Sequence, residues 1–332
     1  MSEEINDIAV SGRIRLARNY YDLPFCNTEM TENAQKCIDR ACRAMDAGTE
    51  EVYTLHLLRS MDKTDRMALM ERHLISRDLL QNSDCGAALI RSDQQVSIMI
   101  NEEDHLRIQS LVSGLNLSQA AAQACAAEEI LEKECGFSFD SQLGYLTSCP
   151  TNTGTGMRAS LMLHLPMLTR FKQMGNVNQS VAKLGLTMRG IYGEGSEALG
   201  DLYQVSNQVT LGRTEEDIVE AVTAVGGQMI DMESTLRQRC MTQQQTELKD
   251  AVLRSYGLLR YAVTMDEKEF MQHWSNLRLG ISMGLLPCSM AVADELLTTA
   301  QNAHVKLYAK EHHLSEDLPA ARCRLIQERL KQ

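Results

Sequence analysis

The sequence predicts an α+β fold, in which a domain of mixed strands and helices is followed by a helical domain. Two apolar runs, Ala87–Ile90 and Val96–Ile100, flank a turn-forming SDQQ segment, which is the pattern of a β-hairpin. Three further runs are typical of strands: residues 144–148, 184–192 and 202–211. From Thr214 almost to the end of the chain, helical periodicity replaces these patterns. The change in periodicity indicates two parts with different architectures.

Helix signals complete this outline. Ser118 is placed to cap a helix that runs through AAAQACAAEEILEKE and ends at Gly136. Residues 158–174 also have a helical pattern, with a kink expected at Pro166. A TxxD sequence beginning at Thr214 resembles a capping box, so we expect a long helix to begin there. Between residues 193 and 200, glycines indicate a loop between two strands.

Length and composition fit this organisation. The 332 residues are enough for one large and one smaller domain, which we place at residues 1–235 and 236–332 without an obvious linker. Hydrophobic residues make up 44% of the chain and charged residues 23%, as in soluble globular proteins. The longest apolar runs fall short of the roughly 20 residues of a membrane span, and the acidic start MSEEINDIAV is unlike a secretory signal. These features predict a cytoplasmic protein that does not bind membranes.

Charge and cysteine content exclude two further classes. A net charge of -11 argues against a broad nucleic-acid surface, so a polyanion such as ATP would need cations concentrated at one place. The ten cysteines include no CxxC pair, which favours buried thiols over a zinc site. The placement of the arginines therefore becomes the informative question.

Four short segments combine arginines, acids and glycines beside predicted strands. They are SGRIR (11–15), NEEDHLR (101–107), CPTNTGTGMR (149–158) and RGIYGE (189–194). Loops next to strands often carry function. Arginine donates paired hydrogen bonds to phosphate oxygens, and carboxylates among such arginines can bind a cation instead. This is the division of labour that is expected if a triphosphate and a guanidinium group must meet.

Each segment alone also has an ordinary structural interpretation. Arg13 and Arg15 would suit a solvated strand edge, and the acids at 102–104 would suit the start of a helix. Residues 153–156 would form a flexible turn, and the Walker sequence GxxxxGK[ST] does not occur. Only the combination of the four segments is specific.

Taken together and in this order, the four segments resemble the phosphagen (guanidino) kinase superfamily, whose signatures NEEDHLR, CPTNxGTxxR and RGxxGE are intact here. The stretches SGRIRLARN, GYLTSCPTNTGTGMRAS, RGIYGEGSEALG and SNQVTLG are most similar to the bacterial protein arginine kinases of the McsB type. The resemblance covers nearly the whole chain. It implies a phosphagen-kinase-like catalytic domain, with a largely antiparallel sheet flanked by helices, followed by a helical C-terminal domain.

The resemblance also implies roles for particular residues. Three would be catalytic: Glu103 as the base, Glu194 as its partner in binding the guanidinium, and Cys149 as a reactive thiolate. The nucleotide would be bound by a longer, arginine-rich set: Ser11, Arg13, Arg15, His73, Arg107, Arg158, Ala159, Ser160, Leu161, Met162, Arg189, Gly190 and Gly193. His73 would lie beside the adenine, although its pattern alone suggests a histidine on a helix surface. Mg²⁺ would be held mainly through the nucleotide phosphates, without a direct protein ligand.

The implied activity is ATP-dependent phosphorylation of arginine side chains in proteins, which would mark proteins for Clp-type degradation or act in stress regulation. In kinases of free creatine or arginine, a small helical domain precedes the catalytic one and closes over the substrate. Only ten residues precede Ser11 here, so we expect a more open site that admits a protein side chain. Cys149 could alternatively be a buried thiol at a strand end.

Two alternative functions remain open at this point. One is a kinase of a free small guanidine, and the other is a catalytically quiet adaptor that binds phosphoarginine or chaperone partners. The missing lid argues against the first, and the intact arginines, glutamates and cysteine argue against the second. The resemblance further implies a homodimer, a zinc-binding activator protein and a Clp chaperone as partners, with protein substrates that expose arginine.

One segment departs from the family pattern. Protein arginine kinases often carry RDxxRA near the C-terminus as a secondary phosphoarginine site. The aligned residues here, Leu318–Cys323, read LPAARC, so only Arg322 is retained. We therefore expect activation by phosphoarginine to be weak or absent.

Overall fold

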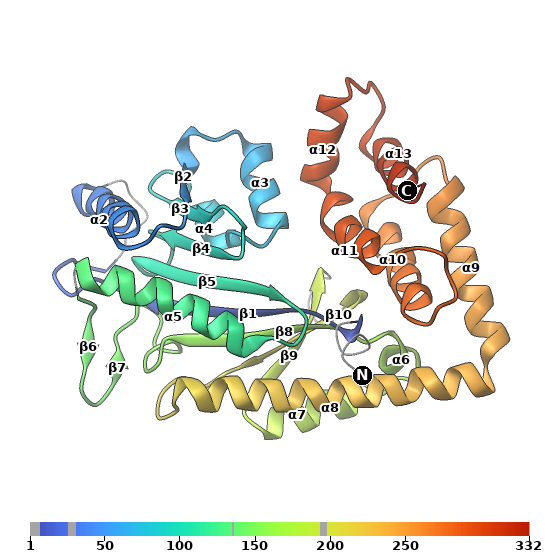
Figure 1. Ribbon diagram of the computed structural model, residues 1–332, viewed down its shortest axis with the longest axis horizontal. Helices are drawn as coiled ribbons and strands as arrows, with labels where there is room; N and C mark the ends of the chain where they lie inside the picture. Colours follow the sequence, from blue (N-terminus) through green and yellow to red (C-terminus); the bar gives the residue numbers. More distant parts are fainter. Residues whose placement is uncertain (1–6, 26–30, 135, 193–197, 332) are drawn as a thin grey trace.

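An eight-stranded antiparallel sheet forms the centre of the protein (Figure 1). The computed structural model describes residues 7–25, 31–134, 136–192 and 198–331. Within these residues the sheet consists of β1 (Ala9–Arg18), β2 (Tyr53–Leu57), β3 (Ala87–Arg91), β4 (Val96–Ile100), β5 (Leu106–Ser113), β8 (Met157–His164), β9 (Leu186–Tyr192) and β10 (Ala198–Asn207). Their order is β2-β3-β4-β5-β1-β8-β10-β9, so the N-terminal strand β1 lies in the middle. A separate hairpin is formed by β6 (Phe139–Asp140) and β7 (Gly144–Tyr145).

One face of the sheet is apolar and is covered by long helices. The helices on this side include α2 (Glu32–Gly48), α5 (Leu117–Glu134) and α8 (Glu215–Gln243), of which α5 contacts β1 and β5 and α8 contacts β8 and β10. Alternate residues of β1, namely Gly12, Ile14 and Leu16, point to this side and are buried. Gly226 of α8 leaves room for Leu161 of β8, because a Cβ there would lie 2.4 Å from its Cδ1 atom. This layer holds the main core of the molecule.

Shorter elements lie on the opposite face, at its two ends. At one end, 3-10 helix η1 (Leu58–Ser60), α3 (Lys63–Glu71) and α4 (Arg77–Gln81) build a small second core on β3 and β4. At the other end, α10 (Glu267–Ser282) contacts β10, where Gly200 approaches Met271 and Trp274. Between these two ends, this face is formed by the central strands β5, β1 and β8.

The C-terminal part is helical. It consists of α9 (Gln245–Tyr261), α10 (Glu267–Ser282), α11 (Met290–Thr299), α12 (Asn302–Glu311) and α13 (Leu318–Arg329). In Figure 1 these helices lie together at the upper right, on the same side of the sheet as α3. Trp274 is fully buried there and donates a hydrogen bond of 2.7 Å to the carbonyl oxygen of Ala293. The predicted α+β fold with a helical C-terminal part is confirmed.

Several predicted elements are confirmed. The hairpin is β3–β4, and the capping box at Thr214 begins α8 with both of its reciprocal hydrogen bonds. The alanine-rich helix is α5, but it begins at Leu117, so Ser118 lies in its first turn and is not the predicted cap. The strands expected at 184–192 and 202–211 correspond to β9 and β10 with shifted ends. Helix α8 continues through residue 235, where the first domain was predicted to end, so that boundary stays a prediction. Among the described helices, none is both long and apolar enough to cross a membrane.

One predicted element is wrong and another is shorter than predicted. Residues 158–174 are not one helix, because β8 occupies Met157–His164 and only the short helices α6 (Pro166–Arg170) and α7 (Met174–Lys183) follow. The residues of β8 do alternate, with apolar side chains at 157, 159, 161 and 163, but Met162 interrupts the polar series and the Ala, Leu and Met content imitates a helix. Pro166 is the first residue of α6, where its missing N–H is tolerated, and is not a kink. The strand predicted at 144–148 is confined to Gly144–Tyr145.

Candidate active site

The strand register brings four predicted arginines to one face of the sheet. Arg15 of β1 pairs directly with Arg158 of β8. Arg13 is two residues before Arg15 on β1, and Arg107 of β5 pairs with Ala17, two residues after it, so both lie on the same face as Arg15. Residues paired across an antiparallel ladder point to the same side, and side chains alternate along each strand. Arg189, on the edge strand β9, joins this side through its pairing with Gln204. We call the side of the central strands that carries these arginines the polar face.

The arginines are close enough to repel one another. Burial, followed by the charges of Arg13, Arg107 and Arg158, lowers the pKa of the Arg15 guanidinium. Burial and the charges of Arg189 and Arg107 lower the pKa of Arg158 in the same way. The Nε atoms of Arg15 and Arg158 are buried and have no hydrogen-bond partner in the described structure. Buried donors of this kind are rare, so an anion with several oxygen atoms would both pair the donors and reduce the repulsion.

Neutral side chains position two of these arginines. Gln204 accepts a hydrogen bond of 3.1 Å from Arg13 Nη2, and Ser206 accepts one of 3.2 Å from Arg158 Nη2. Both acceptors are on β10, two residues apart and therefore on the same face. Because neither acceptor is charged, these two hydrogen bonds orient the arginines without adding a negative charge.

An acidic loop between β4 and β5 borders the arginines. Glu102 is buried and accepts a hydrogen bond of 2.6 Å from Arg107 Nη1 and another from the hydroxyl of Ser76. Burial raises the pKa of Glu102 although Arg107 and Ser76 act in the opposite direction. The next residue, Glu103, is 39% exposed and lies 3.3 Å from Arg107 Nη2. One carboxylate is thus fixed in the structure, and its neighbour is accessible from solvent.

Asp104 connects the acidic loop to the loop of Cys149. Its Oδ1 atom accepts hydrogen bonds of 2.7 Å both from Asn19 Nδ2 and from the backbone N–H of Ser148. Asn19, which follows β1, also donates to the carbonyl oxygen of Leu146 and accepts from the backbone N–H of His105. The exposed carboxylate of Glu103 and the thiol of Cys149 are therefore positioned by the same buried network.

Cys149 is half-buried and lies at the start of a glycine-containing loop. Its Sγ atom is 3.0 Å from the hydroxyl of Thr151. Thr210 fixes this loop by donating from one hydroxyl to the carbonyl oxygens of Thr151 and Thr153. Gly154 has φ 120°, and a Cβ there would lie 2.6 Å from the carbonyl oxygen of Thr210, so only glycine fits. The thiol is held on a compact loop beside the acidic one.

His73 lies on the turn that follows α3 and is half-buried. Burial and the charge of Arg13 lower the pKa of this histidine to about 4, so the imidazole is neutral at pH 7. Its φ of 59° is unusual for a residue other than glycine. The backbone oxygen of His73 accepts a hydrogen bond of 2.6 Å from Gln109, which is on the polar face next to Arg15. The predicted nucleotide-binding histidine is therefore adjacent to the arginines, on a turn and not on a helix surface.

The remaining predicted residues divide between the two faces. Ser11, Ser160 and Met162 share the polar face with Arg13. Ala159 and Leu161 alternate with them, are fully buried in the apolar core, and could contribute only main-chain atoms to a site on the polar face. Gly190 follows Arg189 on β9. Gly193 and Glu194 lie outside the described residues.

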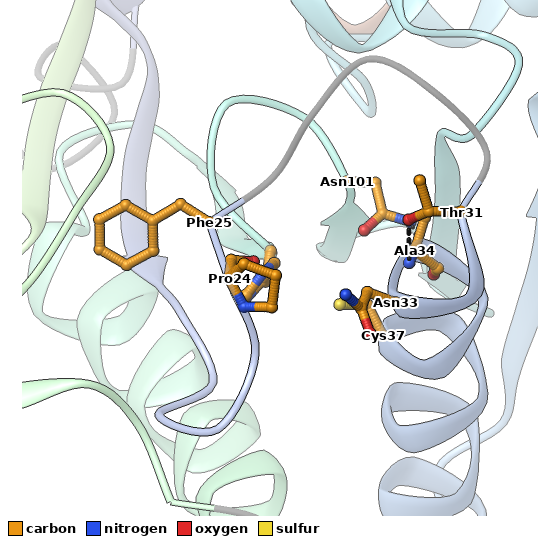
Figure 2. Close-up of a pocket in the computed structure, with 8 residues that line it drawn as sticks. Pro24, Phe25, Thr31, Asn33, Ala34, Cys37 and Asn101 are labelled. Atoms are coloured by element: carbon orange, nitrogen blue, oxygen red, sulfur yellow. Dashed lines mark hydrogen bonds between the residues drawn. The ribbon is translucent and has the colours of Figure 1, made fainter.

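A small pocket lies beside the acidic loop. Figure 2 shows Pro24 and Phe25 at one side of it and the start of α2, including Thr31, Ala34 and Cys37, at the other. Asn101 and His105 of the acidic loop complete the lining, and Asn101 donates to the carbonyl oxygen of Ala34 at 2.9 Å. None of the predicted nucleotide-binding residues in the described ranges lines this pocket. Within the same ranges, His, Cys, Asp and Glu side chains form no group of three that could hold a metal ion.

Sequence reasoning missed several residues of this arrangement. Glu102 and Asp104 stand within the NEEDHLR signature, but the sequence did not show which acid would be buried. Gln204 and Ser206 lie on a predicted strand, and only the register reveals that they meet Arg13 and Arg158. The SNQVTLG stretch gave a signal for Ser206, whereas Gln204 had none.

Comparisons with known proteins define the class to which this fold and site belong. Residues 33–236 match the family model described as the C-terminal catalytic domain of ATP:guanido phosphotransferases. Among solved structures, the duplicated taurocyamine kinase from Schistosoma mansoni is similar with a TM-score of 0.64 and 27% identity, over 75% of this chain and 37% of that one. A lombricine kinase is similar with a TM-score of 0.60 and 27% identity, over 70% of this chain and 68% of that one. The catalytic part is therefore a guanidino-group phosphotransferase.

The C-terminal part and the curated relatives specify the branch. Residues 245–332 match the model described as the C-terminal domain of the protein-arginine kinase McsB. The protein-arginine kinase of Caldanaerobacter subterraneus subsp. tengcongensis is 44% identical over 92% of both chains, and that of Brevibacillus brevis is 41% identical over 98% of this chain and 92% of its own. The chain belongs to the protein-arginine kinases, which transfer a phosphoryl group from ATP to arginine side chains of proteins. The predicted family and activity are confirmed.

Proposed function

We propose that the polar face binds the phosphates of ATP and that Glu103 receives the target arginine at its edge. The observation that carries this proposal is the half-buried Arg15 among three other guanidinium groups, with its buried Nε atom lacking a partner. Such an arrangement is unfavourable alone and favourable around a triphosphate. Arg13, Arg107, Arg158 and Arg189 would complete the phosphate site, with Ser11, Ser160 and Met162 beside them.

His73 suits the adenine end of the nucleotide. Because its pKa is about 4, its imidazole is neutral at pH 7 and adds no charge where the uncharged base would lie. Its position near Arg13 fits a nucleotide that extends from α3 across the polar face. Ala159, Leu161 and Gly190 would contact the nucleotide only through main-chain atoms, because of their positions on β8 and β9.

Glu103 is positioned to act as the general base. A guanidinium group is a poor nucleophile, because its pKa is above about 12 and its lone pairs are delocalised. Arg107 now contacts Glu103 through the same chemical group that a substrate would present, so an incoming arginine could replace that contact. In the transfer, a guanidinium nitrogen bonds to the γ-phosphorus, the bond from that phosphorus to the ADP oxygen breaks, and the proton moves to Glu103. Glu194, outside the described residues, would be the second carboxylate.

Mg²⁺ fits this site as a companion of the nucleotide. It would neutralise charge on the transferred phosphoryl group and be held mainly through phosphate oxygens. The Oε2 atom of Glu102 is buried without a hydrogen-bond partner, and could accept from water on such an ion. Cys149, on the loop tied to Asp104, would contact the substrate guanidinium.

Apart from its protein substrates, the partners of the enzyme are proposed from the family resemblance alone. We propose a homodimer that acts in the cytoplasm with a zinc-binding activator protein and a Clp chaperone, and that has a role in degradation or stress regulation. All of these rest on the family resemblance.

We also propose that phosphoarginine does not activate this enzyme through the LPAARC segment. The guanidinium of Arg322 is buried and donates to the carbonyl oxygens of Ala300 and Met265 and to Asn302 Oδ1. A residue with these three contacts has a structural role in joining α13 to α12. Titrating phosphoarginine into a kinase assay tests this proposal, and a rise in activity would contradict it.

The proposed site is tested by comparing two acceptors and two variants. Purified enzyme with ATP and Mg²⁺ should form acid-labile phosphoarginine on an arginine-rich protein, and little product on free arginine. Glu103→Gln should abolish this product while ATP still binds, because the phosphate site is separate from the base. Arg15→Met should instead weaken ATP binding. Equal activity of Glu103→Gln and the wild type would exclude Glu103 as the base.

A further inference from the structure

The C-terminal helical part contacts the nucleotide side of the molecule through a buried carboxylate. Glu71, the last residue of α3, is buried, and its Oε1 and Oε2 atoms accept hydrogen bonds of 2.7 and 3.0 Å from the backbone N–H groups of Ala303 and His304. These two residues are in the first turn of α12. Figure 1 shows α3 and α12 side by side, although Glu71 and Ala303 are 232 residues apart in the sequence.

Glu71 replaces the cap that α12 lacks in its own sequence. The N-cap residue of α12 is Gln301, whose side chain does not cap the helix but donates to the carbonyl oxygen of Leu297. The first N–H groups of a helix need acceptors, and a carboxylate there also interacts favourably with the helix dipole. Since Glu71 supplies both, the start of α12 and the end of α3 are fixed to each other.

His304 strengthens this link on both sides. Its Nδ1 atom lies 2.7 Å from Glu71 Oε2, and its Nε2 atom accepts a hydrogen bond of 3.1 Å from Arg72 Nε. The acceptor role of Nε2 makes Nδ1 the protonated nitrogen, which donates to the carboxylate. One imidazole of α12 therefore holds two consecutive residues at the end of α3.

The turn that follows these two residues places His73. The N–H of His73 donates to the carbonyl oxygen of Met70 and that of Leu74 to Leu69, which are the two hydrogen bonds of a Schellman motif. The left-handed position of this motif usually belongs to glycine, yet here it is His73, with φ 59°. A strained residue of this kind persists only where its surroundings determine it, and it often marks a functional site. The contacts of Glu71 and Arg72 with α12 are such surroundings.

We propose that Glu71 is a positioning residue for the nucleotide, which fixes the His73 turn through its bonds to the first turn of α12. The proposal rests on the proposed nucleotide site, in which His73 lies beside the adenine. It means that the C-terminal helical part supports ATP affinity through α3, without contacting the nucleotide. Loss of the link should act on ATP binding and leave the transfer step, at Glu103, nearly unchanged.

Glu71→Gln is the direct test, and Glu233→Gln is its matched control. Glu233 is also a buried glutamate that accepts from the first N–H groups of a short helix, those of Met167 and Leu168 in α6, but it reaches them from α8 on the apolar side. For the full-length enzyme we expect Glu71→Gln to raise the KM for ATP and the dissociation constant of ATP by about fivefold, the size of effect that losing a helix cap has. The kcat should stay within about twofold, a split that general destabilisation does not produce. Glu233→Gln should leave the KM for ATP unchanged.

The outcomes separate this proposal from the proposed function. An unchanged KM for ATP in Glu71→Gln, or the same rise in Glu233→Gln, would overturn the role of Glu71. If Glu71→Gln does not fold, His304→Ala, which leaves the carboxylate cap in place, is measured instead and should raise the KM for ATP by a smaller factor; no rise would overturn the proposal.

If the wild type binds ATP but forms no phosphoarginine, the proposed transfer at Glu103 fails while the role of Glu71 is still decided by ATP titration. A wild type that does not bind ATP would refute both.

Discussion

The two faces of the central sheet use the same strands in opposite ways. On the apolar face, Ile14, Leu16 and Leu161 are fully buried against α5 and α8, so each side chain contributes to stability. On the polar face, Arg15 is enclosed by like charges and has a donor without a partner. The apolar face therefore stabilises the fold, whereas the polar face retains unfavourable interactions that a ligand would relieve.

The largest effect should come from the acidic edge of the polar face. Glu103→Gln keeps the size of the side chain but cannot accept the proton, so we expect kcat to fall about 10³-fold. Stability should hardly change, because the side chain is 39% exposed. The measurement is phosphoarginine formation under saturating ATP. The exposed Glu129 on α5 provides the control, since Glu129→Gln should retain full activity.

Arg15→Met would test whether the polar face sacrifices stability for binding. We expect kcat/KM to fall about 10²-fold, because a phosphate contact is lost. The free energy of unfolding should stay the same or rise, since burial of a repelled cation ends. Urea unfolding and kinase assays on the same preparation measure both quantities. A clear loss of stability would show that Arg15 is needed by the fold itself, and Arg254→Met, on an exposed arginine of α9, should change neither quantity.

The opposite outcome is expected for the apolar face. Leu161→Ala leaves a cavity beside Gly226 and should lower the free energy of unfolding by about 2.5 kcal/mol. Its kinetic constants, measured well below the unfolding temperature, should stay near those of the wild type. Met162→Ala, one residue along β8 and on the polar face, should destabilise less because that side chain is only half-buried. If Leu161→Ala raised the KM for ATP more than Met162→Ala, the assignment of the two faces would be wrong.

The smallest effect concerns pH. Because burial lowers the pKa of His73 to about 4, below the roughly 6.5 of an unfolded histidine, the folded state binds fewer protons than the unfolded state between these values. The stability that depends on neutral His73 is therefore present above pH 6.5 and is lost as the pH falls towards 4. Between pH 7 and pH 4.5, His73→Asn should lose about 2 kcal/mol less unfolding free energy than the wild type. Urea unfolding at both pH values checks this, with the exposed His312→Asn as the control that should match the wild type.

Much of the site could be predicted from sequence because its motifs are local. NEEDHLR places Glu102, Glu103 and Arg107 on one turn and the strand after it, where the structure finds them. Arg13 and Arg15 alternate along one strand, so their shared face follows from the period of two. Periodicity failed at β8 because Met162 interrupts the polar series that Arg158 and Ser160 begin, and because Ala, Leu and Met are also common in helices.

The family, the activity, the α+β organisation and the arginines and acids of the site follow from the amino-acid sequence, because they depend on residue types at fixed short spacings. The three-dimensional fold was needed to show which of those residues share a face, that Ala159 and Leu161 point into the core, and that Glu71 caps α12. The physical reason is that strand register and contacts between distant helices are set by packing over the whole chain, which local patterns do not encode.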